Sequence, residues 1–155
     1  MKKAIVAPGL FKDFGGPRKT IGTFAKVLDA PIYSFCDGVR IRNEALAVDN
    51  GEPVESSTVP VLRQFLVPQK EPIGRAEIAF AQSSVVSCHM FYRYYSLWVN
   101  QMYRKHGTPY WFVPHGILDP WVMTKGAFVK KAYWHLGGKR FLKDSKTVIC
   151  ATRAE

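Results

Sequence analysis

Two histidines that follow apolar runs are the residues best placed to do chemistry in this sequence. His89 directly follows the run 85–88, and His115 follows the run 110–113, between a proline and Gly116. An imidazole titrates near neutrality and can hydrogen-bond a hydroxyl group or a phosphate. The alternative for each is a turn histidine whose ring is satisfied by the backbone, which is the commoner role of a single histidine. The sequence leaves both roles open.

A glycine pair followed by two cations forms a second candidate site. Gly15 and Gly16 precede a segment of helical period, so backbone N–H groups there can point at an anion at the start of a helix. Arg18 and Lys19 fall in the first turn, where cations oppose the helix macrodipole at a cost of a few tenths of a kcal/mol. A bound phosphate or carboxylate would reverse the sign of that effect. The alternative is a glycine turn with two solvated side chains.

Several other chemistries are excluded by spacing. A Walker phosphate loop ending at Lys19 would need glycine where Asp13 and Arg18 stand, and no G-x-G-x-x-G is present. No two histidines have metal-ligand spacing, so we expect no metal site and no cofactor. The three cysteines are far apart and lie in or at the end of apolar runs, so we expect buried, reduced thiols at Cys36, Cys88 and Cys150.

The elements that must position these residues alternate between strands and helices. Short apolar runs predict strands, and apolar residues at intervals of three and four predict helices. Alternation of this kind is typical of an α/β fold, with a Rossmann-like, mostly parallel sheet and helices on both faces. The predicted strands are 4–7, 32–36, 59–62 (an edge strand, because of its proline), 85–88, 110–113 and 147–150. The predicted helices are 17–28, 74–81, 91–102, one that begins at Asp119-Pro120, and 127–143, whereas 55–57 are expected in a loop and 39–42 in one arm of a hairpin.

This fold class predicts where the candidate residues meet. Ligands of open α/β sheets bind outside the carboxyl ends of the strands. In a Rossmann-like order the first, fourth and fifth predicted strands are neighbours. The glycine pair, His89 and His115 would then line one edge of the sheet.

The charge of the chain is high and uneven. The net charge is +10; residues 1–75 carry 11 basic and 8 acidic groups, and residues 76–155 carry 11 and 4. An excess of basic residues is typical of proteins that bind nucleic acid, an anionic membrane surface or a phosphorylated substrate. It also increases solubility. One cluster is either a solvated helix face or a contact with anionic lipid headgroups: Lys125, Lys130, Lys131, Lys139, Arg140 and Lys143.

Aromatic and basic residues are interleaved between Phe91 and Arg104, a pattern that can stack on single-stranded nucleic acid. The aromatic residues there largely follow the core-facing stripe of a helix, at Tyr94, Tyr95 and Trp98. Core packing is therefore the favoured interpretation, and nucleic acid is not the expected partner.

Three stretches together resemble the N-terminal domain of GT-B-fold glycosyltransferases of the group 1 type, also called family 4. They are Gly15-Gly16-Pro17, the run 85–89, and residues 107–121 followed by Lys130-Lys131. The third resembles the family pattern P-Y-x-x-x-P-H-G-x-L-x-P-W with its lysine-bearing helix. The ending 150–155 resembles the family's last strand and its A-T-S-x-x-E. The resemblance is weakest from about residue 38 to residue 80.

The resemblance implies a single Rossmann-like domain over 1–155 that binds the acceptor of a retaining glycosyltransferase. It implies that Gly15 and Gly16 approach a phosphate and that His115, within the Pro-His-Gly116 motif, reaches the acceptor or the transferred sugar. Arg18, Lys19 and His89 are added as phosphate- or substrate-binding candidates. The donor would be a nucleotide sugar and the acceptor a glycan or glycolipid.

The same resemblance implies that the nucleotide-sugar pocket and its paired glutamates belong to a C-terminal domain that is missing here. Thr152 and Glu155 have the spacing of a helix-initiating capping box, so the chain would be cut after its sixth strand. We expect these 155 residues to lack transferase activity by themselves. The expected location is cytoplasmic, with peripheral contact at the inner face of the membrane. The alternative is a non-enzymatic, basic α/β module that binds nucleic acid.

Overall fold

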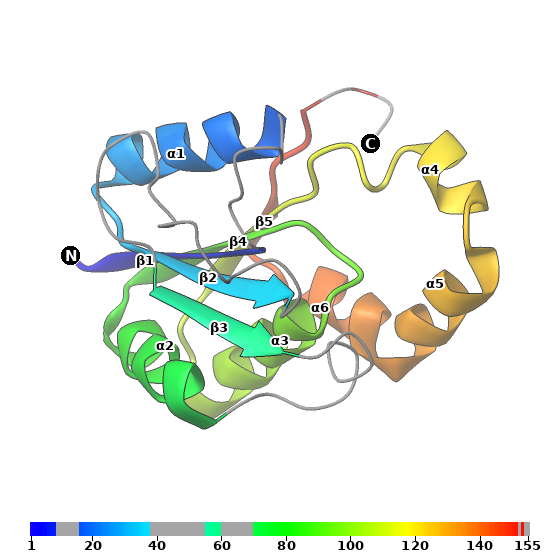
Figure 1. Cartoon of the computed structure of the whole chain (residues 1–155). Helices are drawn as coiled ribbons and strands as arrows, with labels where there is room; N and C mark the ends of the chain where they lie inside the picture. Colours follow the sequence, from blue (N-terminus) through cyan, green and yellow to red (C-terminus); the bar gives the residue numbers. More distant parts are fainter. Residues whose placement is uncertain (9–15, 38–54, 60–69, 152, 154–155) are drawn as a thin grey trace.

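The computed structural model describes residues 1–8, 16–37, 55–59, 70–151 and 153, with the backbone alone for 34–37, 55–59 and 70–75 (Figure 1). Strands and helices alternate along the chain. The elements are β1 (Lys3–Pro8), α1 (Gly16–Leu28), β2 (Ile32–Asp37), β3 (Glu55–Val59), α2 (Lys70–Gln82), β4 (Val85–His89), α3 (Tyr94–His106), β5 (Tyr110–Val113), α4 (Pro120–Thr124), α5 (Ala127–Tyr133), the π-helical segment η2 (Trp134–Gly138), α6 (Lys139–Asp144) and β6 (Thr147–Val148).

The strands form one parallel sheet. Its order is β3-β2-β1-β4-β5-β6, and every neighbouring pair is parallel. This is the strand order of the Rossmann fold, with the crevice expected where the order reverses between β1 and β4. The predicted α/β fold class is confirmed, as is the adjacency of the first, fourth and fifth strands.

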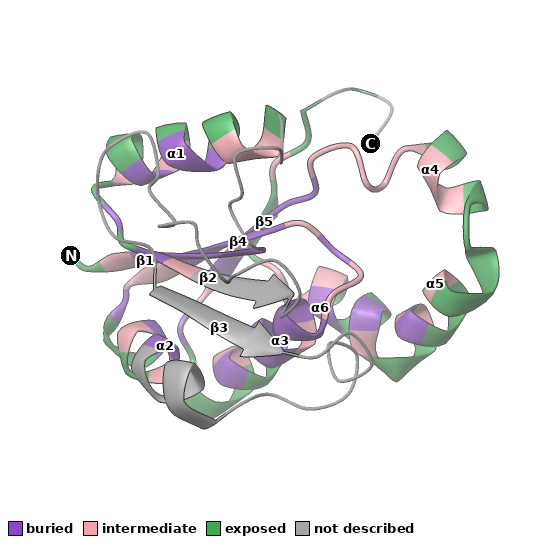
Figure 2. Ribbon diagram, viewed as in Figure 1, coloured by how far each residue is buried: buried purple, intermediate pink, exposed green. Residues whose placement is uncertain are grey.

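Successive side chains of β1 point to opposite faces and pack in two separate cores. Ile5 and Ala7 join Ile21 and Ala25 of α1 on one face. Ala4 and Val6 lie on the other face with residues of α2, α3 and α6, including Phe80, Tyr95, Trp98 and Phe141. Figure 1 shows α1 above the sheet and α2, α3 and α6 below it, and Figure 2 shows the buried residues lining the sheet between them. The fold is thus a three-layer sandwich with a larger core on the α3 side.

The third strand differs from its prediction. The described strand is Glu55–Val59, whereas the prediction was 59–62, so the polar residues 55–57, which were expected in a loop, are in the sheet. Parallel pairing with β2, with Tyr33 opposite Glu55, explains this, because ladder hydrogen bonds can override weak side-chain propensity. Among the described strands, β3 is the outermost on its side of the sheet. Residues 60–62 and the hairpin expected over 39–42 lie outside the described residues.

The helix predicted over 127–143 is present but interrupted. Its middle is the π-helical η2, where Gly137 has φ 154° and a Cβ at Gly137 would lie 3.0 Å from the Leu97 side chain. Glycine is the residue that tolerates both conditions. The predicted start at Asp119 is confirmed: its carboxylate accepts a hydrogen bond from the Trp121 amide, with Pro120 opening α4.

Two smaller predictions were wrong in part. Only Thr147–Val148 of the last predicted strand is in the sheet. Cys88 is buried as expected, but Cys150 is exposed because it lies beyond that short strand.

Within the described residues, no helix combines the length and the apolar character needed to cross a membrane.

Candidate functional site

The site begins with two polar side chains on the buried α1 face of β4. Ser87 and His89 are two residues apart, so both point to the same face of the sheet, and both are almost fully buried. The Ser87 hydroxyl and His89 Nε2 are 3.0 Å apart. The ring of Phe24, from α1, packs edge-on against His89 with centroids 5.1 Å apart. On the other side of the strand, the Tyr95 hydroxyl donates to the His89 carbonyl.

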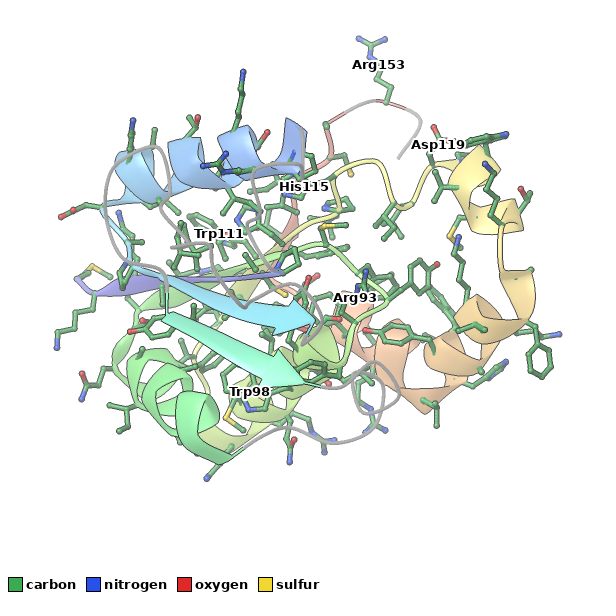
Figure 3. All side chains as sticks on the ribbon, in the orientation of Figure 1. Arg93, Trp98, Trp111, His115, Asp119 and Arg153 are labelled. Carbon is green, nitrogen blue, oxygen red and sulfur yellow. The ribbon has the colours of Figure 1, made fainter. Side chains whose placement is uncertain are left out.

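His115 is brought onto this pair by a turn after β5. Val113 lies opposite His89 in the sheet register, so His115 leaves the sheet beside the end of β4. It adopts a left-handed backbone with φ 58°, and Gly116 follows with φ 80°. The turn places His115 Nε2 2.8 Å from His89 Nδ1. Figure 3 shows the His115 side chain on the α1 side of the sheet.

The result is a hydrogen-bonded row from Ser87 through His89 to His115. His89 is fully buried and its pKa lies well below the ordinary value of 6.5, first because burial disfavours its charge and then because His115 is close. A neutral imidazole has one donor and one acceptor nitrogen. When His89 donates to Ser87 it must accept from His115, and when it accepts from Ser87 it donates to His115. The half-buried His115 can therefore meet a ligand while His89 holds its ring.

This row predicts that the chain loses stability in weak acid. Below the ordinary histidine pKa of 6.5 the unfolded chain binds a proton at position 89, whereas the folded chain, with the lowered pKa, does not. We expect the free energy of unfolding to fall by about 1.4 kcal/mol per pH unit below that value, until the pH passes the folded pKa. Urea unfolding at a series of pH values measures the slope.

A matched pair of variants isolates the contribution of His89. In His89→Gln the part of the slope due to this residue should vanish, although the variant is less stable. In His135→Gln, which changes an exposed histidine in η2, the slope should remain. An unchanged slope in His89→Gln would refute the assignment.

Backbone strain is concentrated at this edge of the sheet. Met90 (φ 68°) and Tyr92 (φ 56°) follow β4 in the left-handed region, as His115 does after β5. The Met90 amide donates to the Val113 carbonyl, which ties the two strand exits together. Each such residue costs on the order of 1 kcal/mol, and strain of this kind clusters at functional sites.

Gly16 is placed at the same edge by the topology, because α1 follows β1 and the carboxyl ends of parallel strands share one edge. Gly16 is the first residue of α1, about 12 Å along the helix from Phe24 at 1.5 Å per residue. A Cβ at Gly16 would meet no atom of the described residues within 4 Å. Gly15 lies outside the described residues.

The two cations of the first turn differ in environment. Arg18 is half-buried, with its Nε atom enclosed. Lys19 is exposed and, within the described part of the chain, makes no hydrogen bond to either histidine. The structure therefore joins His89, His115 and Gly116 in one place, with Gly16 at the same edge, and does not bring in Lys19.

The interleaved aromatic residues of α3 belong to the core, as predicted. Tyr94, Tyr95 and Trp98 are 7%, 1% and 4% exposed. They cannot stack on nucleic-acid bases without opening the fold.

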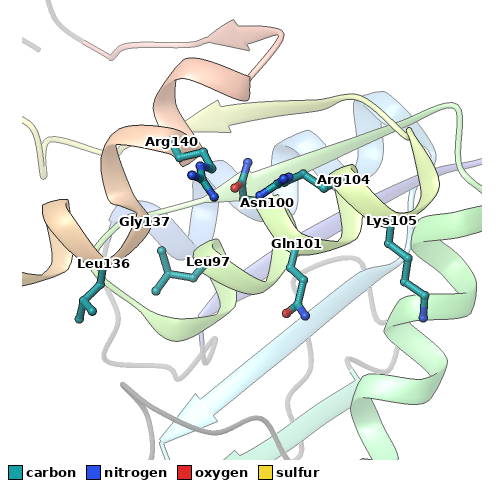
Figure 4. Close-up of a pocket in the computed structure, with 8 residues that line it drawn as sticks. All are labelled: Leu97, Asn100, Gln101, Arg104, Lys105, Leu136, Gly137 and Arg140. Carbon is teal, nitrogen blue, oxygen red and sulfur yellow. The ribbon is translucent and has the colours of Figure 1, made fainter.

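A separate groove of about 510 Å³ lies on the outer side of α3, against η2 and α6. Figure 4 shows Arg104 and Arg140 on either side of Asn100, with Leu97 and Leu136 nearby. Asn100 is buried and donates to Asp144 and to the Tyr110 hydroxyl. The groove is lined by α3 and the η2–α6 segment, whereas the histidine row lies on the α1 face of the sheet.

Two contributors to the site were missed by sequence reasoning. Ser87 could have been found, since it shares the face of His89 at the two-residue period of a strand. Phe24 could not, because its contact depends on how α1 crosses the sheet. Within the described residues, no group of three His, Cys, Asp or Glu side chains could hold a metal ion.

No family model matches the chain, and no curated protein matches it. Among solved structures, the chain is similar to a protein of unknown function from Vibrio parahaemolyticus. The two share 8% sequence identity with a TM-score of 0.48, over 99% of this chain and 94% of the other.

Proposed function

We propose that this chain is the acceptor-side domain of a GT-B-fold glycosyltransferase that transfers a sugar from a nucleotide sugar to a glycan or glycolipid. The observation that carries the proposal is the row Ser87–His89–His115 at the carboxyl edge of the sheet. It lies where ligands of this fold class bind, and His115 belongs to the stretch with the most specific resemblance. In this role the His115 imidazole hydrogen-bonds the acceptor or the transferred sugar, and His89 holds its ring.

The start of α1 has the complementary role. The N-terminus of a helix carries unpaired N–H groups and the positive end of the macrodipole, which suit a phosphate. No atom of the described residues lies within 4 Å of a Cβ placed at Gly16, and Arg18 and Lys19 add positive charge. The donor or an acceptor phosphate would lie there, between this domain and a C-terminal domain that supplies the nucleotide-sugar pocket. The reaction would take place at the cytoplasmic face of the membrane.

The test starts with the gene. Under the proposal, the reading frame beyond Glu155 encodes a second Rossmann domain with two spaced glutamates. The longer product should transfer labelled sugar from at least one nucleotide sugar to a membrane or glycan extract, and the 155-residue chain should not. A stop codon directly after Glu155, or turnover by the short chain, would overturn the proposal.

The nucleic-acid alternative has less support, because three of the aromatic residues that would stack on bases, Tyr94, Tyr95 and Trp98, are buried. It predicts binding of single-stranded DNA near physiological salt, weakening by about 0.7 log unit per phosphate contact for each log unit of salt. Such binding by the 155-residue chain would favour this alternative over the glycosyltransferase.

A further inference from the structure

The outer face of α5 and η2 is an apolar stripe that no described residue covers. Phe128, Val129 and Leu136 are 87%, 56% and 72% exposed, and Ala132 between them is exposed as well. The steps from 128 to 132, from 129 to 132 and from 132 to 136 are the three- and four-residue intervals of one helix face. An amphipathic helix in a globular domain normally packs such a face against the core. Here the apolar face points outward instead.

The helix is held in this orientation by its inner face. Tyr133 is buried, packs edge-on against Phe91 and shares a hydrogen bond with Ser96. The Lys130 ammonium group donates to the Val122 carbonyl and lies 5.4 Å from the centre of the Tyr92 ring. The exposure of the stripe is therefore fixed by the packing of α5 on the body of the domain. Figure 1 shows α4 and α5 extending beyond the end of the sheet.

A second apolar group with a cation lies on the adjacent α4. Trp121 is 65% exposed, and the Lys125 ammonium group lies 3.6 Å from the centre of its ring. Residues 120–143 contain six Lys or Arg and no Asp or Glu. Exposed apolar side chains are thus embedded in a segment of purely positive charge.

We propose that the outer face of α4, α5 and η2 is a binding surface for an anionic lipid bilayer. Trp and Phe side chains enter the boundary between headgroups and acyl chains, while lysines reach the phosphates, each contributing to the attraction. The charge favours lipid over a second copy of this chain, because a symmetric contact would bring two basic surfaces together. The inference adds to the proposed function the surface that would contact the membrane; it does not depend on glycosyl transfer and is tested without any sugar.

Sedimentation of the 155-residue chain with lipid vesicles tests the surface directly. We expect binding to vesicles of phosphatidylglycerol and phosphatidylcholine in equal parts, and little binding to phosphatidylcholine alone. Phe128→Ser should weaken the binding about ten-fold, and Lys125→Glu at least about five-fold. Circular dichroism checks that each variant is folded, which is expected because both positions are exposed.

Val27→Ser is the matched control, since Val27 is a 76% exposed apolar residue on α1. It should bind vesicles as the unchanged chain does. The proposal is overturned if the chain ignores anionic vesicles, or if Val27→Ser weakens binding as much as Phe128→Ser. It is also overturned if the chain forms dimers that Phe128→Ser dissociates, which would assign the stripe to a second copy.

Discussion

Replacing Phe141 by alanine is expected to lower the free energy of unfolding by about 3–5 kcal/mol. Phe141 is fully buried in the larger core, with its ring centre 5.0 Å from that of Tyr110, 5.1 Å from Phe112 and 5.5 Å from Phe91. The loss combines the transfer of the ring from water with the cavity left among rigid neighbours. Natural domains are stable by about 5–15 kcal/mol, so this loss is a large fraction of the total.

Urea unfolding of Phe141→Ala and Phe128→Ala provides a matched comparison. The chemical change is identical, but Phe128 is 87% exposed, so its replacement should alter stability by no more than about 0.5 kcal/mol. Equal losses in the two variants would contradict the packing described for α6.

The second large effect is expected at His115. If the proposed glycosyl transfer is correct, His115→Ala should lower turnover by the longer gene product by about 10²–10³-fold, the usual loss when one hydrogen-bonding group that acts on the reacting molecules is removed. The measurement is kcat/KM with the nucleotide sugar that the unchanged enzyme accepts.

Two further variants separate chemistry from folding. His115 has a positive φ, so His115→Asn is made as well, because asparagine tolerates this backbone better than alanine. It should fold normally and remain as impaired as His115→Ala. His135→Ala, at an exposed position in η2, should keep nearly full turnover. Turnover that survives both changes at position 115 would remove His115 from the reaction.

Much of the fold follows from local pattern. The runs 85–88 and 110–113 are apolar enough to specify buried strands, and Asp119-Pro120 marks a helix start by its own chemistry. Strand β3 escaped prediction because Glu55, Ser56 and Ser57 have the composition of a loop and become a strand only through pairing with β2. That pairing joins two segments that are distant in sequence, so the residue types of the segment 55–59 by themselves do not predict it.

The place of the site in the fold was predictable from the sequence, but the contacts between its residues were not. The pattern of strand ends indicated that His89 and His115 share an edge of the sheet. Their hydrogen bond depends on two further conditions, the register of Val113 against His89 and the left-handed backbone of His115. Neither has a signature in the sequence, since histidine adopts a positive φ only occasionally.

The apolar stripe of α5 shows the converse problem. Helical spacing of Phe128, Ala132 and Leu136 is the pattern that normally identifies a core-facing side. Only the packing of Tyr133 on Phe91 reveals that the stripe faces away from the body. Helical periodicity therefore identifies an apolar face, but it does not tell whether that face packs against the core or is exposed.

The polar strand β3 also affects how this protein behaves in concentrated solution. A strand at the border of a sheet offers unpaired N–H and C=O groups to other chains, which is a common start of aggregation. At one border the sequence of β3 is Glu-Ser-Ser-Thr-Val, which holds a single apolar residue and so favours such pairing little. At the other border β6 has 2 residues, too few to template a partner strand. Both edge strands of the sheet thus disfavour strand-by-strand polymerisation.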